Sequence, residues 1–263
     1  MLMEVRKHLK LIYEYFKVNL SAGMEYRTSF LVQVFGMALN NSAFIFFWWI
    51  LYERIPSIAG YGFNDVLFIW ALASSSFGFV HIVFGNILNL SDTIIKGELD
   101  TYLVQPKDVY INVLCSRTRI SAWGDLAYGY VLFIPVFGWG KVFLFTLFVV
   151  FGGLLMGSIF AAAHTLTFFT GNANAIARLV VSFTITFTTY PEGIYKGALK
   201  WMVYSFLPAG FIVFLPHRIL KAFNWWSVLI LIIVDVLYIT AGYYFFRAGL
   251  KKYESGNLIT TKL

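Results

Sequence analysis

The feature that most constrains this chain is a series of apolar runs, each about as long as a lipid bilayer is thick. A helix needs about 20 largely apolar residues to cross the hydrocarbon core, where its backbone must form its hydrogen bonds internally. Six ranges qualify or come close, namely 28–52, 66–90, 109–137, 142–169, 175–190 and 225–246. The pattern predicts an all-α integral membrane protein with six transmembrane helices in a single domain, residues 1–263.

Composition supports a membrane protein and argues against a soluble one that binds nucleic acid. The chain is 59% hydrophobic and only 13% charged, whereas soluble domains are about one-quarter charged. A net charge of +7 could suggest nucleic acid in a soluble protein. Cytoplasmic loops of membrane proteins, however, are enriched in Lys and Arg. We therefore expect membrane lipid around the chain and no nucleic-acid partner.

The first residues have the pattern of a helix that lies in the membrane surface. In residues 3–20 apolar side chains recur every three or four residues, and Lys and Arg occupy much of the remaining surface. Such a basic amphipathic helix lies in the interface and does not cross the bilayer. The apolar face consists of Val5, Leu9, Ile12, Phe16 and Leu20.

Residues 198–217 are apolar, but Pro208-Ala209-Gly210 divides them into two pieces too short to cross the membrane. A break of this kind at membrane depth requires neighbouring protein to satisfy the freed backbone groups. We expect a re-entrant hairpin on the outer side. With six spans and both termini in the cytoplasm, 14 of the 20 Lys and Arg residues lie on the inner side, as the positive-inside rule requires.

A polar interruption, residues 91–108, separates the second and third apolar runs and holds six of the chain's charged side chains. Residues 91–104 can form a short helix with an apolar stripe and a polar face, on which a partner could act. An ordinary connecting loop is the alternative. The stripe comprises Ile94, Ile95, Leu99, Tyr102 and Leu103, and the polar face comprises Gly97, Glu98, Asp100 and Thr101.

The chain lacks recognisable catalytic motifs. Its one Gly-Lys pair, Gly140-Lys141, has Pro135 where a phosphate-binding loop requires glycine. The four histidines are scattered and Cys115 is the only cysteine, so we expect neither a metal site nor catalytic residues. Asp125 and Asp235 lie within apolar runs, where ionisable residues usually serve function. They could line a polar path or form static salt bridges, for example Asp125 with Arg119.

Three segments resemble those of a known transporter family. Residues 95–106, IKGELDTYLVQP, resemble the segment after the second span in type-two ATP-binding-cassette (ABC) exporter permeases, in particular a compact subfamily of about 260 residues. Residues 208–211, PAGF, followed by Leu215-Pro216, resemble the outer hairpin of that subfamily. The tail, residues 249–257, GLKKYESGN, resembles its C-terminal signature.

The resemblance implies a permease of the bacterial cell membrane that uses a separate ABC ATPase subunit, which binds ATP and Mg²⁺. Residues 3–20 would be the connecting helix and residues 91–104 the coupling helix, rigidly continuous with span two. A second permease, identical or related, would meet this one along spans one, two and five. The family often has a basic residue where this chain has Gln105. The residues implied in ATPase coupling are Ile95, Gly97, Glu98, Leu99, Asp100, Tyr102 and Leu103.

The substrate path is expected between two permeases, because six spans make a small bundle. We expect Asn40, Asn41, Thr184 and Thr188 to line it, since Thr184 and Thr188 share a helix face from which Thr186 points away. The hydroxyls and amides could instead serve helix packing. Pro208 and Pro216 would belong to an outer gate. The expected function is export of a drug, lipid or peptide-like amphipath; an ATP-independent carrier or channel, or a membrane enzyme, is the alternative.

Overall fold

The computed structural model describes residues 2–254, with side chains from Arg6 onward. Within this range the chain is helical, and its only β feature is an isolated bridge between Ile58 and Tyr61. The side chain of Val5, on the predicted amphipathic face, and the end of the tail motif, residues 255–257, lie outside the described part. The longer helices are α1 (Leu2–Glu25), α2 (Arg27–Arg54), α3 (Phe63–Val83), α7 (Ala122–Phe137), α8 (Val142–Thr165), α10 (Asn174–Thr189) and α13 (Trp225–Leu250).

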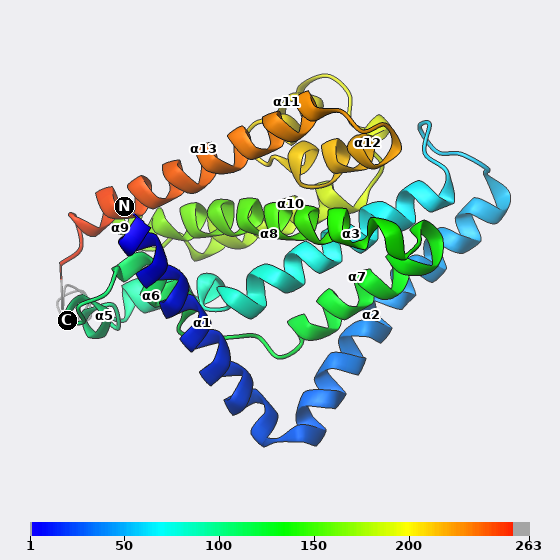
Figure 1. Ribbon diagram of the computed structural model, residues 1–263. Helices are drawn as coiled ribbons and strands as arrows, with labels where there is room; N and C mark the ends of the chain where they lie inside the picture. The colour runs from blue at the N-terminus through cyan, green and yellow to red at the C-terminus, as the bar shows by residue number, and fades with distance from the viewer. Residues whose placement is uncertain (1, 255–263) are drawn as a thin grey trace.

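Shorter helical segments connect these elements. They are η1 (Ile87–Asn89), α4 (Leu90–Ile95), α5 (Asp100–Leu103), α6 (Val109–Cys115), η2 (Trp139–Lys141), α9 (Thr167–Thr170), η3 (Glu192–Ile194), α11 (Ala198–Tyr204), η4 (Gly210–Phe214) and α12 (Leu215–Lys221). Figure 1 shows α5 and the C-terminal end of α13 at one end of the bundle and α11 and α12 at the other. We call these the α5 end and the α12 end.

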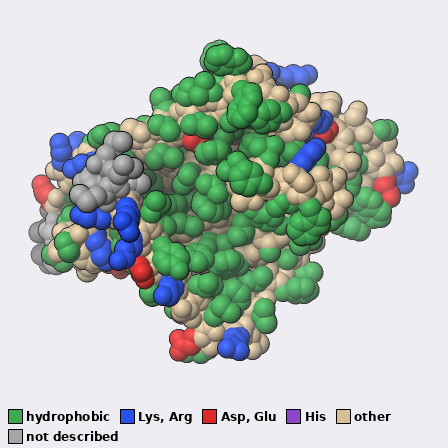
Figure 2. Space-filling view, viewed as in Figure 1, with side chains coloured by type: hydrophobic (Ala, Val, Ile, Leu, Met, Phe, Trp, Pro, Cys, Tyr) green, Lys and Arg blue, Asp and Glu red, His purple; other side chains and the backbone are tan. Residues whose placement is uncertain are grey.

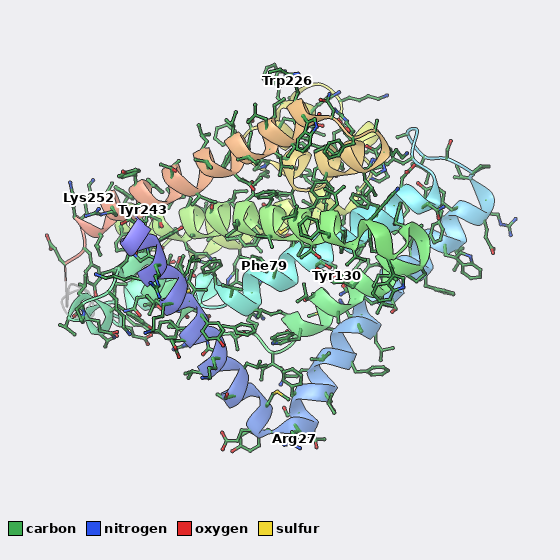
Figure 3. The ribbon with its side chains drawn as sticks, in the orientation of Figure 1. Arg27, Phe79, Tyr130, Trp226, Tyr243 and Lys252 are labelled. Carbon is green, nitrogen blue, oxygen red and sulfur yellow. The ribbon has the colours of Figure 1, made fainter. Side chains whose placement is uncertain are left out.

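Helix α3 forms the centre of the bundle, packed against α7 and α8. In the most apolar stretch of α3, 83% of the residues are buried inside the chain, compared with 6% in α2. Figure 2 shows hydrophobic side chains covering most of the middle of one face, with most charged side chains toward its margins. In Figure 3 the labelled Lys252 lies near the α5 end, Trp226 near the α12 end, and Phe79 and Tyr130 between them.

Glycines let α3 and α7 approach until their backbones touch. A Cβ atom on Gly129 of α7 would lie 2.0 Å from Ser75 Oγ and 2.3 Å from the Ala71 carbonyl oxygen of α3. A Cβ atom on Gly78 of α3 would lie 2.5 Å from the backbone nitrogen of Leu126. Small residues at helix interfaces are the usual route to tight packing where lipid removes the hydrophobic driving force.

Four segments are long and apolar enough to cross a membrane, namely Arg27–Arg54, Phe63–Val83, Trp139–Thr170 and Trp225–Leu250. They correspond to predicted spans one, two, four and six. Helix α7 is apolar but shorter, and α10, close to predicted span five, has 16 residues. The prediction of an all-helical membrane protein is therefore confirmed, whereas the count of six spans stays a prediction.

Predicted spans two and three are each interrupted, and the two interruptions face each other. Helix α3 ends at Val83 instead of residue 90, and span three is divided into α6 and α7 by residues 116–121. The carbonyls freed at the end of α3 accept hydrogen bonds from the other break, because Arg119 N donates to His81 O at 3.1 Å and Thr118 Oγ1 to Ile82 O at 3.0 Å. The prediction of a coupling helix rigidly continuous with span two was wrong.

The predicted coupling helix, 91–104, is two short helices, α4 and α5. The chain turns between them at Gly97, whose φ of +72° is a left-handed conformation that glycine adopts at little cost. The single-helix prediction failed because the apolar stripe counted residues on both sides of this turn as one face.

Helix α1 extends to Glu25, beyond the predicted range of 3–20, and meets α2 at Tyr26. Figure 1 shows the two helices forming a V, with α1 slanting across the direction of α13. Two hydrogen bonds hold α1 against α6, from Tyr15 Oη to Asn112 Oδ1 at 2.6 Å and from Asn19 Nδ2 to the Cys115 carbonyl at 3.0 Å.

Residues 198–221 form two helical limbs that begin and end near the α12 end. Helix α11 is the first limb, and η4 with α12 is the second. The turn between them contains the buried Pro208, and the Tyr238 hydroxyl of α13 donates to the Ser205 carbonyl. Ile212 of η4 reaches Gly152, near the middle of α8. The break covers residues 205–209, so it overlaps the predicted Pro208-Ala209-Gly210 but begins earlier, and Gly210 already belongs to η4.

Replacing Gly129 with Ala should destabilise the bundle, because the added methyl group forces α3 and α7 apart. Overpacking of this kind costs about 1–3 kcal/mol. The midpoint of thermal unfolding in detergent, followed by tryptophan fluorescence, should fall. Gly140→Ala is the control, since a Cβ atom added to Gly140 would have no other atom within 4 Å. Equal midpoints for the two variants would contradict the proposed backbone contact.

Candidate functional site

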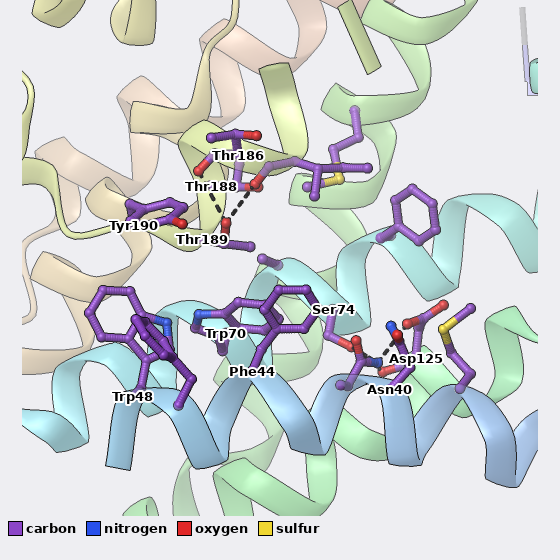
Figure 4. Close-up of a pocket in the computed structure, with 17 residues that line it drawn as sticks. Asn40, Phe44, Trp48, Trp70, Ser74, Asp125, Thr186, Thr188, Thr189 and Tyr190 are labelled. Carbon is purple, nitrogen blue, oxygen red and sulfur yellow. Dashed lines mark hydrogen bonds between the residues drawn. The ribbon is translucent and has the colours of Figure 1, made fainter. Parts of the chain in front are cut away.

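A cavity of about 370 Å³ lies between α2, α3, α7 and α10 (Figure 4). Aromatic side chains make up much of its wall, and the polar groups lie on α2, α3, α7 and α10. The aromatic residues are Phe44, Phe47, Trp48, Trp70, Phe77 and Tyr190. The polar residues are Asn40, Asn41, Ser74, Asp125, Thr186, Thr188 and Thr189. The wall is completed by Met37, Ala73, Met156 and Ile185.

The only charged residue in the wall, Asp125, is held by two neighbouring helices. Asn41 Nδ2 donates to Asp125 Oδ1 at 2.7 Å, and Ser74 Oγ donates to the Asp125 backbone carbonyl at 2.8 Å. Asp125 Oδ2 has no hydrogen-bond partner. Within the described residues Asp125 forms no ion pair with Arg119 or with any other Lys or Arg. The expected alternative of a static salt bridge to Arg119 is therefore wrong.

Three of the four residues predicted to line a path meet at this cavity. Asn40, Asn41 and Thr188 lie in its wall, but Thr184 does not. Thr184 is buried, and its hydroxyl donates to the Val180 carbonyl of its own helix at 2.8 Å. Thr186, which was expected to point elsewhere, lies in the wall. The four-residue spacing does place Thr184 and Thr188 on one buried face of α10, but only Thr188 reaches the cavity.

Sequence reasoning expected aromatic-rich walls from span one. Phe44, Phe47 and Trp48 of that span follow one another at helical spacing and lie in the cavity wall. Trp70 is the less predictable member, because it comes from α3 and stacks on Phe44 with ring centroids 5.0 Å apart. Asp235, the other intramembrane candidate, is buried in α13 away from this cavity, and its Oδ2 also lacks a partner.

At the α5 end, α4 is tied to the junction between α8 and α10. Ser91 Oγ lies 2.7 Å from His164 Nδ1, and Thr167 Oγ1 donates to Ser91 Oγ at 2.9 Å. Asn174 Nδ2, at the start of α10, donates to Asp92 Oδ1 at 2.8 Å. These contacts join α4 to α8 and α10. Helix α4 is separated from α3 by the break after Val83.

The residues predicted for coupling divide into a buried and an exposed set. Leu99 is fully buried in the hydrophobic core and so anchors the segment to it. Ile95, Gly97, Asp100 and Tyr102 are partly buried, while Glu98 is exposed. Leu103 is 41% exposed and its neighbour Val104, which the prediction did not include, is 84% exposed. Leu103 and Val104 thus expose two neighbouring aliphatic side chains in the same segment as Glu98.

At the α12 end, Glu192 gathers hydrogen bonds from the connecting loop and from both limbs of the hairpin. Arg218 Nη2 lies 2.5 Å and 2.7 Å from its two carboxylate oxygens. Tyr204 donates at 2.6 Å and Tyr61 at 3.2 Å. Beside this cluster, Asp65 Oδ1 lies 2.6 Å from Lys221 Nζ. The predicted gate residues Pro208 and Pro216 are buried within the hairpin that these contacts hold in place.

Glu192→Gln should weaken the attachment of the hairpin, because it removes charge from hydrogen bonds worth about 2 kcal/mol in total. Burial alone would raise the pKa of Glu192, but hydrogen bonds from Tyr204 and Arg218 outweigh burial and hold this pKa below its usual range. The stabilisation is therefore present above the ordinary pKa of a glutamate and is lost as the pH falls through the lowered pKa. Thermal unfolding measured across this range should show the loss in the native chain and not in Glu192→Gln.

Glu53→Gln serves as the control, because Glu53 is an exposed carboxylate in the last turn of α2, at the same end. It should leave both the unfolding midpoint and its pH dependence unchanged. A Glu192→Gln variant with the native pH profile would show that the cluster does not hold the hairpin.

Together, the helices long enough to cross a membrane and the cavity between them describe a multi-pass membrane protein. Residues 38–256, most of the chain, match the family model for ABC-2 family transporter proteins. The chain belongs to the ABC-2 transporter family, whose members are membrane subunits without catalytic activity of their own, and the predicted family is confirmed. No curated protein and no solved structure matches it.

Proposed function

We propose that this chain is the membrane-spanning permease of an ATP-driven exporter, and that a separate ABC ATPase docks on α4 and α5. The observation that carries the proposal is the family match over residues 38–256 together with the exposed surface formed by Glu98, Leu103 and Val104. ATP and Mg²⁺ belong to the ATPase subunit.

In this proposal the protein lies in a bacterial cell membrane. The α5 end and both termini face the cytoplasm, and the α12 end faces outward. Six crossings follow if α6 with α7 makes the third and α10 the fifth. Residues 198–221 then form the outer re-entrant hairpin. Helix α1 lies along the inner surface, where its basic side chains meet lipid headgroups.

Motion of the docked ATPase passes to the cavity through α4. The paired breaks at residues 84–86 and 116–121 separate the docking segment from the α3–α7 pair. The contacts of Ser91 with His164 and of Asp92 with Asn174 connect it instead to α8 and α10. Since α10 supplies one wall of the cavity, a rigid-body shift of the segment moves that wall.

A second permease covers α2 and the exposed face of α10. Helix α3 has little surface left for a partner, so the contact is confined to spans one and five, without the expected span two. Gln33 and Asn40 are exposed on α2. Polar amides facing hydrocarbon are unfavourable, and a partner helix relieves this cost. The cavity then opens toward the region between the two permeases, where the substrate path is proposed.

Replacing both Leu103 and Val104 with Asp should release the ATPase. Loss of two apolar contacts costs about 3 kcal/mol, or roughly a hundredfold in affinity. Co-purification of the permease with its co-expressed ATPase, followed by substrate-stimulated ATP hydrolysis, measures the effect. Ile194→Asp, an exposed aliphatic residue at the opposite end, is the control. Native co-purification in the double variant would exclude α5 as the docking site.

Thr186→Phe should block export while basal ATP hydrolysis continues, because the larger side chain fills the cavity from an exposed position. Ser182→Phe, one turn earlier on the exposed face of α10 but outside the cavity wall, is the control and should retain export. Substrate efflux from cells and ATPase activity of the purified complex are the two measurements. Full export by Thr186→Phe would place the path outside this cavity.

A further inference from the structure

We infer that the cavity between α2, α3, α7 and α10 binds an amphipathic organic cation. The inference deepens the proposed function by giving the substrate class, and it rests on that function for transport, although binding can be measured without transport. It stands on two orphaned polar atoms in the cavity wall and on the aromatic groups between them.

The first orphaned atom is Asp125 Oδ2. Asp125 is only 5% exposed, and its other oxygen already accepts from Asn41. No Lys or Arg side chain lies within ion-pair distance of it within the described chain. A buried carboxylate without a direct ion pair is costly, by several kcal/mol for each ion even after relaxation. A bound cation removes that cost, and the remaining lining residues carry no competing charge.

The aromatic wall suits the same chemistry. A cation near the face of Trp, Tyr or Phe is attracted by about 0.5–2 kcal/mol, more when water is excluded. Phe44, Phe77 and Trp70 line the cavity with Asp125, and Figure 4 shows Asp125 toward one end with Trp48 and Tyr190 toward the other. An ammonium group beside Asp125 therefore leaves the apolar body of the ligand among the aromatic rings.

The second orphaned atom is the indole nitrogen of Trp70, a buried donor without an acceptor. Its place in the wall favours a ligand that carries a hydrogen-bond acceptor some distance from the cation. Thr186, Thr188 and Thr189 add hydroxyl oxygens, since each hydroxyl hydrogen is donated to a carbonyl of α10. A volume of about 370 Å³ lies within the range of small-molecule sites.

The test compares a cation with its neutral carbon isostere. Phenyltrimethylammonium and tert-butylbenzene have nearly the same shape and differ in charge. Binding of each to the full permease in lipid nanodiscs is measured by calorimetry and by quenching of tryptophan fluorescence. The cation should bind more tightly than the isostere, and Asp125→Asn should weaken cation binding at least about tenfold, which corresponds to about 1.4 kcal/mol. Asp125→Asn should leave binding of the isostere unchanged.

Two further variants keep the result interpretable. Asp235→Asn changes an equally buried, unpartnered carboxylate outside the cavity and should leave cation binding at the native level. Phe44→Leu keeps an apolar side chain at a half-exposed position but removes a ring, and should weaken the cation more than the isostere. It provides the test if Asp125→Asn does not fold.

Equal affinity for the cation and its isostere in the native protein would overturn the inference, as would cation binding that is insensitive to both Asp125→Asn and Phe44→Leu. If such a permease still docks its ATPase through Leu103 and Val104, the exporter proposal stands and only the substrate class fails. If selective cation binding is found but no ATPase associates, the inference stands and the exporter proposal fails.

Discussion

The contact between the backbones of α3 and α7 is the constraint on which the rest of the structure depends. Gly78 and Gly129 allow it, and α3 becomes buried between α7 on one side and α8 on the other. Because α3 occupies the centre, the cavity must form beside it, where α2 and α10 leave α3 partly uncovered. The same contact aligns Ser74 of α3 with Asp125 of α7, so the packing of the bundle also positions the one charged group of the cavity.

The lengths of the apolar runs predicted the long helices well. An apolar run in a membrane must form its backbone hydrogen bonds internally, which favours a helix. It could not predict the breaks at residues 84–86 and 116–121. Neither contains proline, and each is stabilised by hydrogen bonds from the other, as Arg119 to His81 illustrates. Pairing of this kind joins residues far apart in the chain, and periodicity along one segment carries no sign of it. The break at Pro208 was predictable because its cause is local.

The site shows the same division. Asn40, Asn41 and Thr188 were correctly associated, since polar residues in apolar spans tend to face protein or a cavity. The choice between Thr184 and Thr186 depended on how α10 is rotated against α3 and α8, which tertiary packing determines. For Asp125, the choice between a salt bridge and a polar lining depended on which side chains surround it in the folded chain, and the sequence does not give these. Val104 was not among the residues predicted for ATPase coupling, because its exposure follows from the turn at Gly97 and not from its residue type.

The outer face of α2 is exposed within one chain, and this has a consequence for how the protein responds to perturbation. Helix α2 is held to the core along one side only, where Asn41 donates to Asp125 and Val34 meets Gly124, and its most apolar stretch is 6% buried. Side chains on the outer face of α2 therefore contribute little to the folding stability of a single chain. A substitution on the outer face of α2 can change the assembly without changing the unfolding temperature, so a thermally normal variant can still be an incorrectly assembled one.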